Sequence, residues 1–226
     1  MSNSSVVATY NIHHGAEPKH WARLARTASP LAGLDADLIA LQEVDHRVVR
    51  SGFQAQSRRL ALRLGMQEVF APARRWGPGG LYGIAVLTKV PLRAVEYVRL
   101  PRFDGEQRLA ILGQAQLGGQ AVSVAAVHLH YNNVAAPHQL EVVLRRLMAR
   151  PGPHLILGDF NVGADLIGPT AEKFGFALPP ATLTFPASGP REAIDWILGN
   201  GLQVSEIRRV ESNASDHCPL VARVTV

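Results

Sequence analysis

The chain has 226 residues, of which 47% are hydrophobic and 18% are charged, and it contains 20 glycines and 15 prolines. This composition excludes a disordered, fibrous or collagen-like protein, and no apolar run approaches the ~18 residues of a membrane span. The 23 Lys and Arg residues against 18 Asp and Glu give a net charge of +5, which suggests an anionic partner.

The single cysteine, Cys218, excludes an intrachain disulfide and a thiolate metal cluster, and it fits a reducing compartment. The first ten residues carry neither a basic segment nor an apolar stretch of signal-peptide length. We therefore expect a cytoplasmic location and no stable membrane insertion. Because no repeat or linker-like change of composition divides the sequence, we expect one domain over residues 1–226 and a monomer.

The first part of the chain alternates predicted strands and helices. β-branched residues predict a strand over residues 6–11, and an apolar run predicts a buried strand over residues 37–43. Between them we expect a helix over residues 19–34, kinked or divided by a proline. Another helix is expected over residues 53–64, ended by Gly65.

Predicted strands then follow closely, separated by turn-rich pieces, and they indicate an antiparallel meander. They cover residues 66–72, 82–88, 92–100, 108–117 and 121–130.

A helix with one apolar face is expected after this meander, over residues 137–150. Further strands are expected over residues 154–158, 194–198, 204–210 and 219–226. About ten strands and two helical regions predict two β-sheets packed face to face, with helices outside.

Several polar residues stand where predicted strands end or begin, which is where a packed scaffold presents side chains to a pocket. Each has a structural alternative as a turn or helix-capping residue. Two of the carboxylates are harder to explain in this way, because a carboxylate in an apolar run must be paired or hold a metal; these two are Glu43 and Asp195. The full set is Asn11, Glu43, His128, His130, Asp159, Asn161, Asp195, Asp216 and His217.

Five blocks of sequence resemble, in the same order, the motifs of the endonuclease/exonuclease/phosphatase superfamily, which includes DNase I and exonuclease III-type enzymes. They are residues 9–11 (TYN), 41–43 (LQE), 127–129 (VHL), 158–161 (GDFN), and the pair 194–195 (ID) with 215–217 (SDH). One such block is a weak signal, but five in order over nearly the whole chain are specific. The resemblance implies an α/β fold, a four-layer αββα sandwich with two mixed β-sheets.

The candidate ligands are carboxylates and an amide without a thiolate, and this chemistry selects Mg²⁺ or Mn²⁺. The resemblance implies that Glu43 is the main metal ligand, with Asn11 and Asp216 contributing directly or through water.

The same resemblance gives roles to the remaining motif residues. It makes His217 the general base or a phosphate stabiliser, held by Asp195. Asp159 and Asn161 would position the attacking water and a non-bridging oxygen, and His128 would donate to the phosphoryl oxygens. Whether His217 or Asp159 takes the proton stays open.

Candidate substrate contacts lie elsewhere in the chain. Arg108 could reach the phosphate or lie in a surface turn. Arg74, Arg75 and Trp76 combine cations with an aromatic ring, a pattern that holds a backbone and stacks a base, although such loops are commonly solvated. Tyr82 belongs to a Tyr-Gly pair that resembles small hydrolases of the superfamily.

From these features we predict a metal-dependent phosphodiesterase or nuclease that hydrolyses DNA or RNA by in-line attack of water. The first alternative is hydrolysis of small or lipid-borne phosphates, such as inositol phosphates or phospholipid head groups. The second is a non-catalytic binding module on the same fold. The presence of every motif ligand and histidine argues against that module.

Overall fold

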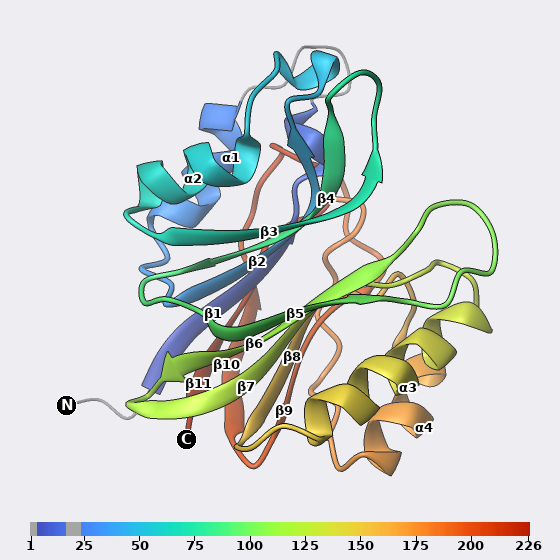
Figure 1. Ribbon diagram of the computed structural model, residues 1–226. Helices are drawn as coiled ribbons and strands as arrows, with labels where there is room; N and C mark the ends of the chain where they lie inside the picture. The colour runs from blue at the N-terminus through green and yellow to red at the C-terminus, as the bar shows by residue number, and fades with distance from the viewer. Residues whose placement is uncertain (1–3, 17–23) are drawn as a thin grey trace.

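The computed structural model describes residues 4–16 and 24–226. Within these ranges, eleven β-strands form a six-stranded and a five-stranded sheet (Figure 1). The first sheet, in the order β10-β11-β1-β2-β4-β3, consists of β1 (Ser4–Asn11), β2 (Leu38–His46), β3 (Gln67–Arg75), β4 (Leu81–Thr88), β10 (Gln203–Arg209) and β11 (Leu220–Thr225). The second, in the order β5-β6-β7-β8-β9, consists of β5 (Arg93–Arg99), β6 (Leu109–Leu117), β7 (Gln120–His128), β8 (His154–Asp159) and β9 (Asp195–Asn200).

Four α-helices of the described chain form the two outer layers. Helices α1 (Leu24–Ala32) and α2 (Gln56–Leu64) share an apolar cluster with the outer face of the first sheet. Helices α3 (Ala135–Met148) and α4 (Ala164–Lys173) share another with the second sheet. Figure 1 shows the two helix pairs on opposite sides of the sheets. The predicted four-layer αββα sandwich is therefore confirmed.

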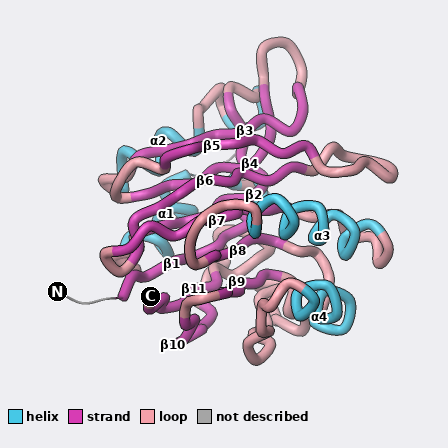
Figure 2. The backbone as a smooth tube through the Cα atoms, turned by 60° about the horizontal axis from the view of Figure 1, so that its bottom comes forward, coloured by secondary structure: helices cyan, strands magenta, loops and turns pink. Residues whose placement is uncertain are grey.

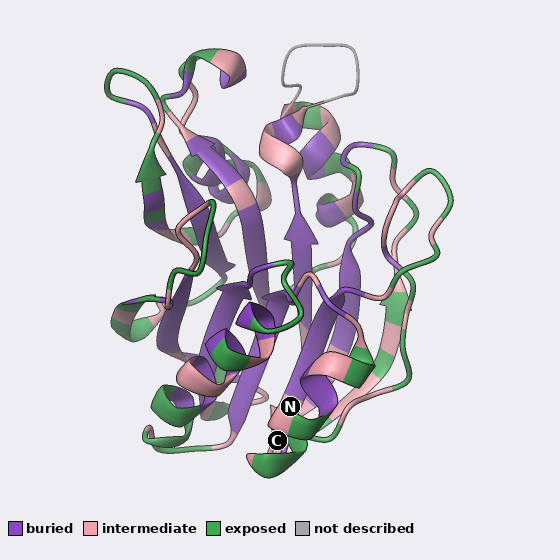
Figure 3. Ribbon diagram, turned by 90° about the vertical axis from the view of Figure 1, so that its right-hand side faces the viewer, coloured by how far each residue is buried: buried purple, intermediate pink, exposed green. Residues whose placement is uncertain are grey.

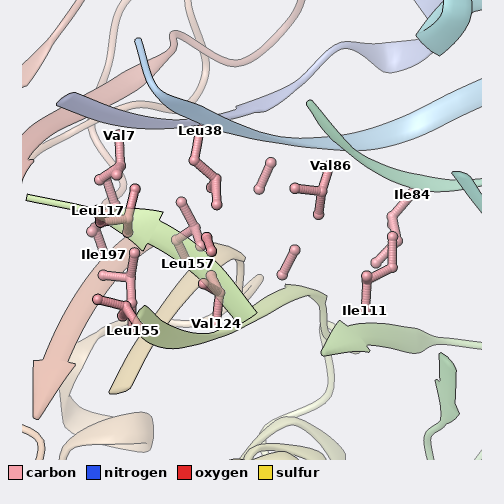
Figure 4. Close-up of a cluster of buried hydrophobic side chains, with 14 of the residues drawn as sticks. Val7, Leu38, Ile84, Val86, Ile111, Leu117, Val124, Leu155, Leu157 and Ile197 are labelled. Atoms are coloured by element: carbon pink, nitrogen blue, oxygen red, sulfur yellow. The ribbon is translucent and has the colours of Figure 1, made fainter. Parts of the chain in front are cut away.

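The inner faces of the two sheets form one apolar core (Figure 4). Val7, Leu38 and Leu155 lie in this core, whereas the neighbouring Ile39 and Ile156 face the helices. Because these central strands bury both faces, their sequences are continuous apolar runs rather than alternating patterns. Figure 3 shows the central strands buried along most of their length, with exposed segments on helices and loops.

Two parallel strand pairs determine where functional side chains gather. β1 pairs with β2, and β7 pairs with β8, each in parallel, with α1 and α3 in the respective crossovers. The remaining strand pairs are antiparallel; the pairing of β1 with β11 places Ser4 opposite Thr225, so the first and last strands lie side by side (Figure 2). The carboxyl ends of the four parallel strands carry Asn11, Glu43, His128 and Asp159. A hydrogen bond from Asn11 to Asp159 joins the two sheets at this edge.

Helix α4 was not predicted from the sequence. Its segment contains Gly168 and Pro169, and both residue types disfavour a helix interior. Burial of Ile167 and Ala171 against the second sheet stabilises the helix despite them. Pro30 likewise lies inside α1, which neither ends nor divides there, and residues 19–23 of the expected helix lie outside the described residues.

The predicted meander is wrong as a single unit. β3 and β4 belong to the first sheet, where β4 lies between β2 and β3, whereas β5, β6 and β7 belong to the second. Apolar runs and turns identify strands but not their partners, because both sheets are built from the same kinds of residue.

Three local boundaries also differ from expectation. Helix α2 begins at Gln56, and Phe53 is an exposed turn residue with a left-handed φ of 56°. Arg74 and Arg75 are strand residues at the end of β3 and do not form a loop. β7 ends at His128, so His130 follows the strand.

Candidate active site

Asn11 ends β1 and contacts residues of both sheets. Its Nδ2 donates hydrogen bonds to Glu43 Oε1 (3.1 Å) and to Asp159 Oδ2 (2.9 Å). Its Oδ1 accepts a hydrogen bond from the backbone N–H of His13 (3.0 Å). A side-chain amide has two N–H groups and one carbonyl, so all three bonds can form together. This buried amide therefore fixes the two carboxylates on either side of it.

Glu43 leaves the otherwise apolar strand β2 at an irregularity. The pairing of β2 with β4 shifts between Leu41 and Val44, and Glu43 has a left-handed φ of 58°. A bulge of this kind redirects a side chain, and bulges are frequent beside active sites. The Glu43 carboxylate is consequently half-buried at the edge of the site.

Three side chains near this carboxylate are His13, His14 and Tyr82. Ligand atoms of His13, His14 and Glu43 all lie within 4.8 Å of one another. Burial lowers the pKa of His14 to about 4, helped by the charge of Arg50, so its imidazole is neutral at pH 7. Burial also raises the pKa of Tyr82, whose hydroxyl makes a hydrogen bond with Glu43. This part of the site thus combines one carboxylate with two imidazoles and a phenol.

Asp159 ends β8 and is fully buried. Its Oδ1 accepts the backbone N–H of Asn161 (2.8 Å), while its Oδ2 accepts the amide of Asn11. Asn161 has a left-handed φ of 59°, and its Nδ2 donates to the backbone oxygen of Leu129 (3.0 Å). The turn after β8 is thereby tied to the end of β7.

His217 is held by Asp195, and both are buried. Its Nδ1 lies 2.9 Å from Asp195 Oδ2, and because a carboxylate only accepts hydrogen bonds, Nδ1 carries the proton. Thr184 Oγ1 donates to the same Asp195 oxygen (2.6 Å). The second nitrogen, Nε2, lies 3.8 Å from Asp159 Oδ2. The ring of Phe185 packs against the imidazole at a centroid distance of 4.8 Å.

The electrostatics of this cluster favour a bound proton. Burial disfavours a charged imidazole, but the negative charges of Asp195 and Asp159 outweigh it and raise the pKa of His217. Burial also raises the pKa of Asp159, although the positive charge of His217 opposes the rise. The two carboxylates therefore keep the His217 imidazole positively charged at neutral pH.

His128 and Arg108 lie on another side of Asp159. Arg108 Nη1 is 3.0 Å from His128 Nδ1 and 2.9 Å from Nε2, which puts the guanidinium against the ring face rather than on one nitrogen. His128 Nε2 is 3.5 Å from Asp159 Oδ2. Burial lowers the pKa of His128, and the charges of Arg108 and His217 lower it further. His128 is thus neutral at pH 7 beside a buried cation.

The predicted substrate contacts around Trp76 form a cluster of their own. The guanidinium carbons of Arg50 and Arg74 lie 4.0 and 3.9 Å from the centroid of the Trp76 ring, and both are within 5.6 Å of the Tyr82 centroid. Glu106 links Arg74 to Arg108, with both ion pairs at 3.3 Å. Arg75 is exposed at the end of β3. The Trp76 ring therefore packs against the guanidinium groups of Arg50 and Arg74.

Asp216 lies at the exposed margin of the site. Its Oδ1 is 3.6 Å from His13 Nδ1, and the neighbouring Ser215 donates to the backbone oxygen of Asn11 (2.8 Å). The structure thus brings Asp216 to the same side as Glu43, through His13. His130 lies apart from these groups, since its Nε2 is 2.6 Å from Asp104 and its N–H donates to Gln139.

Three contributors were not predicted from the sequence. Thr184 lies in a segment without regular structure, and Arg50 lies in a 3₁₀ turn over Val49–Ser51, so neither interrupts a recognisable pattern. Ser215 belongs to the SDH block, but the sequence gives it no role of its own. A pocket of about 290 Å³ opens beside Asp216, and it is lined by His13, Ala16, Pro186, Ala187, Ser188, Asn213, Ser215 and Asp216.

Comparisons with known proteins agree with this architecture. The model of the Endonuclease/Exonuclease/phosphatase family matches residues 8–217. Comparison of the sequence with curated proteins found no match. Among the described helices, none has the length and apolar character needed to cross a membrane.

Solved structures share the fold over nearly the whole chain. An endonuclease/exonuclease/phosphatase from Beutenbergia cavernae DSM 12333 is 20% identical, with 99% of this chain and 72% of that chain covered and a TM-score of 0.78. A functionally unknown conserved protein from Enterococcus faecalis V583 is 25% identical, with 97% and 98% covered and a TM-score of 0.79. The human Nocturnin catalytic domain, with bound sulfate, is 21% identical, with 99% and 95% covered and a TM-score of 0.74.

Proposed function

Because the chain belongs to the endonuclease/exonuclease/phosphatase family, whose members hydrolyse phosphate esters, we propose that it is a divalent-metal-dependent phosphodiesterase acting on nucleic acid. Water would attack the phosphorus in line with the leaving oxygen. The observation that carries the proposal is the buried Asp195–His217 pair, whose second imidazole nitrogen, Nε2, lies 3.8 Å from Asp159 Oδ2. Asn11 connects this pair, through Asp159, to the Glu43 carboxylate.

Proton transfer is the task of Asp159 and His217. The bond to Asp195 holds the imidazole with Nδ1 protonated and Nε2 directed at Asp159. A proton leaving the attacking water would enter this coupled pair, and the imidazolium would offset charge on the phosphoryl oxygens. Asn161 uses its Nδ2 on Leu129, which leaves its Oδ1 to accept a hydrogen bond from that water.

Charge that builds on the phosphoryl group needs donors on its other side. His128 and Arg108 supply them, since the guanidinium and the imidazole are in contact and largely buried. Donors that are fixed before the reaction stabilise developing charge without reorganisation. Arg108 is itself held by Glu106, so its orientation does not depend on substrate.

Glu43 would hold Mg²⁺ or Mn²⁺, with Asp216 contributing a second oxygen. The donor chemistry fits such an ion, because Glu43 is a half-buried carboxylate surrounded by further oxygen and nitrogen ligands. Asn11 turns its Nδ2 toward Glu43, so we expect it to orient that carboxylate or to act through water. A bound divalent cation supplies charge neutralisation and stabilises the leaving oxygen.

A polynucleotide is the favoured substrate. Arg50 and Arg74 lie against Trp76 on the Tyr82 side of Glu43, and the exposed Arg75 directly precedes Trp76 in the sequence. The chain has a net charge of +5. Basic groups beside the scissile bond suit the adjoining phosphates of a strand. The pocket of about 290 Å³ beside Asp216 instead favours the second candidate, a small or lipid-borne phosphate ester, because it has room for one compact group.

A substrate panel separates these candidates. Purified protein with Mg²⁺ or Mn²⁺ would be incubated with supercoiled plasmid, an abasic duplex, single-stranded DNA, RNA, inositol phosphates and phospholipids. We expect cleavage of at least one polynucleotide, with His217→Ala at least ~100-fold slower and with His138→Ala, an exposed histidine on α3, fully active. Hydrolysis of soluble phosphomonoesters without cleavage of any polynucleotide would overturn the assignment.

A further inference from the structure

His13 and His14 have no step of their own in the proposed hydrolysis, although only Ile12 separates them from Asn11 at the end of β1. They form a 3₁₀ turn over His13–Gly15, and their rings meet edge to face with centroids 4.6 Å apart. Together with Glu43 they offer ligand atoms that all lie within 4.8 Å of one another. Neither histidine is needed to close the turn, because its hydrogen bonds are made by the backbone.

The spacing of these ligand atoms is close to what a single metal ion requires. Imidazole nitrogens and carboxylate oxygens bind first-row metals at about 2.0–2.2 Å, so two ligands on opposite sides of one ion are about 4.2 Å apart. Ligands at adjacent positions are about 3 Å apart. Small side-chain rotations would bring the three ligand atoms, now within 4.8 Å of one another, into this range of separations.

The surroundings keep the three side chains converged. His13, His14 and Glu43 all have left-handed backbone conformations, with φ of 42°, 46° and 58°. Such conformations are strained in non-glycine residues and persist only where the surroundings enforce them. Here Asn11 accepts the N–H of His13, and Gln56 donates to the backbone oxygen of His14.

The immediate surroundings of the two imidazoles suit a bound cation. His14 Nδ1 is buried and makes no hydrogen bond within the described part of the chain. His13 Nδ1 lies 3.6 Å from Asp216 Oδ1, so a second carboxylate adjoins the set. A buried nitrogen without a partner is unfavourable unless something else satisfies it.

We propose that His13 and His14 ligate, through imidazole nitrogen, the same divalent cation that Glu43 holds, and that the site therefore prefers Mn²⁺ to Mg²⁺. This inference rests on the proposed function only in that Glu43 binds an ion. Mg²⁺ favours oxygen ligands and keeps much of its water, whereas Mn²⁺ accepts carboxylate and imidazole together. The two histidines would thus determine metal preference.

Electron spin-echo spectroscopy of the Mn²⁺-loaded protein tests the proposal, because directly bound ¹⁴N modulates the echo. We expect this modulation in the wild-type protein and its loss in the double variant His13→Asn/His14→Asn. Asparagine suits the test because it tolerates left-handed φ values and lacks an imidazole. The control is His138→Asn on α3, which should retain the modulation.

Binding constants provide a second readout. Calorimetric titration should show the double variant binding Mn²⁺ at least ~10-fold more weakly, with a smaller loss for Mg²⁺. Absence of ¹⁴N modulation in the wild-type protein, or equal losses for both ions in the folded variant, would overturn the proposal.

The two proposals can fail separately. Wild-type hydrolysis of phosphodiesters in Mg²⁺ without ¹⁴N modulation in Mn²⁺ would refute imidazole ligation and leave the phosphodiesterase assignment standing. Clear ¹⁴N modulation without hydrolysis of any phosphodiester would support the ligands and refute that assignment.

Discussion

Replacing Asp195 by Asn removes the carboxylate that holds His217 but keeps the size of the side chain. The bond from His217 Nδ1 to Asp195 Oδ2 is 2.9 Å long and is buried at both ends. Hydrogen bonds to charged groups contribute about 1.5–3 kcal/mol, and each 1.36 kcal/mol is about tenfold in rate. We therefore expect Asp195→Asn to lower kcat by about 10- to 150-fold.

Thr184→Val provides a graded comparison at the same oxygen. Thr184 donates a hydrogen bond of 2.6 Å to the Asp195 oxygen that His217 also contacts. Loss of a typical hydrogen bond costs about 0.5–1.5 kcal/mol, so we expect a decrease of about 2- to 13-fold. Asp195→Asn should also lower the pKa of His217, because it removes the largest influence that raises that pKa.

Single-turnover cleavage of a labelled oligonucleotide would measure these effects, with circular dichroism as the check on folding. An NMR titration of the imidazole C–H would follow the pKa of His217. If the pair acts as a unit, Asp195→Asn/His217→Ala should lose no more activity than His217→Ala alone. A folded Asp195→Asn protein with more than half of the wild-type rate would refute the role given to this bond, as would losses that multiply in the double variant.

Three further expectations concern stability and metal binding. Gly83→Ala would put a methyl group 2.0 Å from a backbone oxygen of β3, so urea unfolding should show that the free energy of unfolding falls by at least ~2 kcal/mol. Gly33→Ala, where the added methyl group would meet no atom within 4 Å, should leave that free energy nearly unchanged. The hydrogen bond from Arg150 lowers the pKa of Glu96. Because the pair is only partly buried, it should stabilise the wild-type protein over Glu96→Gln by less than ~1 kcal/mol at pH 7. That difference should vanish as the pH falls below 4.5 and Glu96 is protonated, and a constant difference would contradict the assignment. Glu43→Gln should weaken Mn²⁺ binding at least ~10-fold by calorimetry, and unchanged affinity would exclude Glu43 as a ligand.

The sequence predicts the candidate site residues better than it predicts the residues that hydrogen-bond to them and hold them in place. Asn11, Asp159 and Asp195 are visible because polar residues beside buried apolar strands need a physical reason. In the structure, Asn11 of the first sheet makes a hydrogen bond with Asp159 of the second, and Asp195 makes one with His217. Thr184, which supports the same carboxylate, lies in irregular chain and breaks no pattern.

The limits of prediction for the fold have a similar cause. Local apolar runs located the strands, because burial on both faces leaves a strong signal in sequence. Pairing between strands and the assignment of β5 to the second sheet depend on contacts between distant segments. Helix α4 went unrecognised because Gly168 and Pro169 obscure a helix that tertiary packing stabilises. The bulge that redirects Glu43 depends on its pairing with β4, which no local pattern encodes.

The most direct test of the proposed hydrolysis compares wild-type protein with His217→Ala on a labelled single-stranded oligonucleotide, in Mn²⁺ and in EDTA. We predict cleavage by the wild-type protein in Mn²⁺, none in EDTA, and a rate for His217→Ala lower by ~10²–10⁴-fold. Undiminished cleavage in EDTA, or near-normal cleavage by a folded His217→Ala protein, would contradict it.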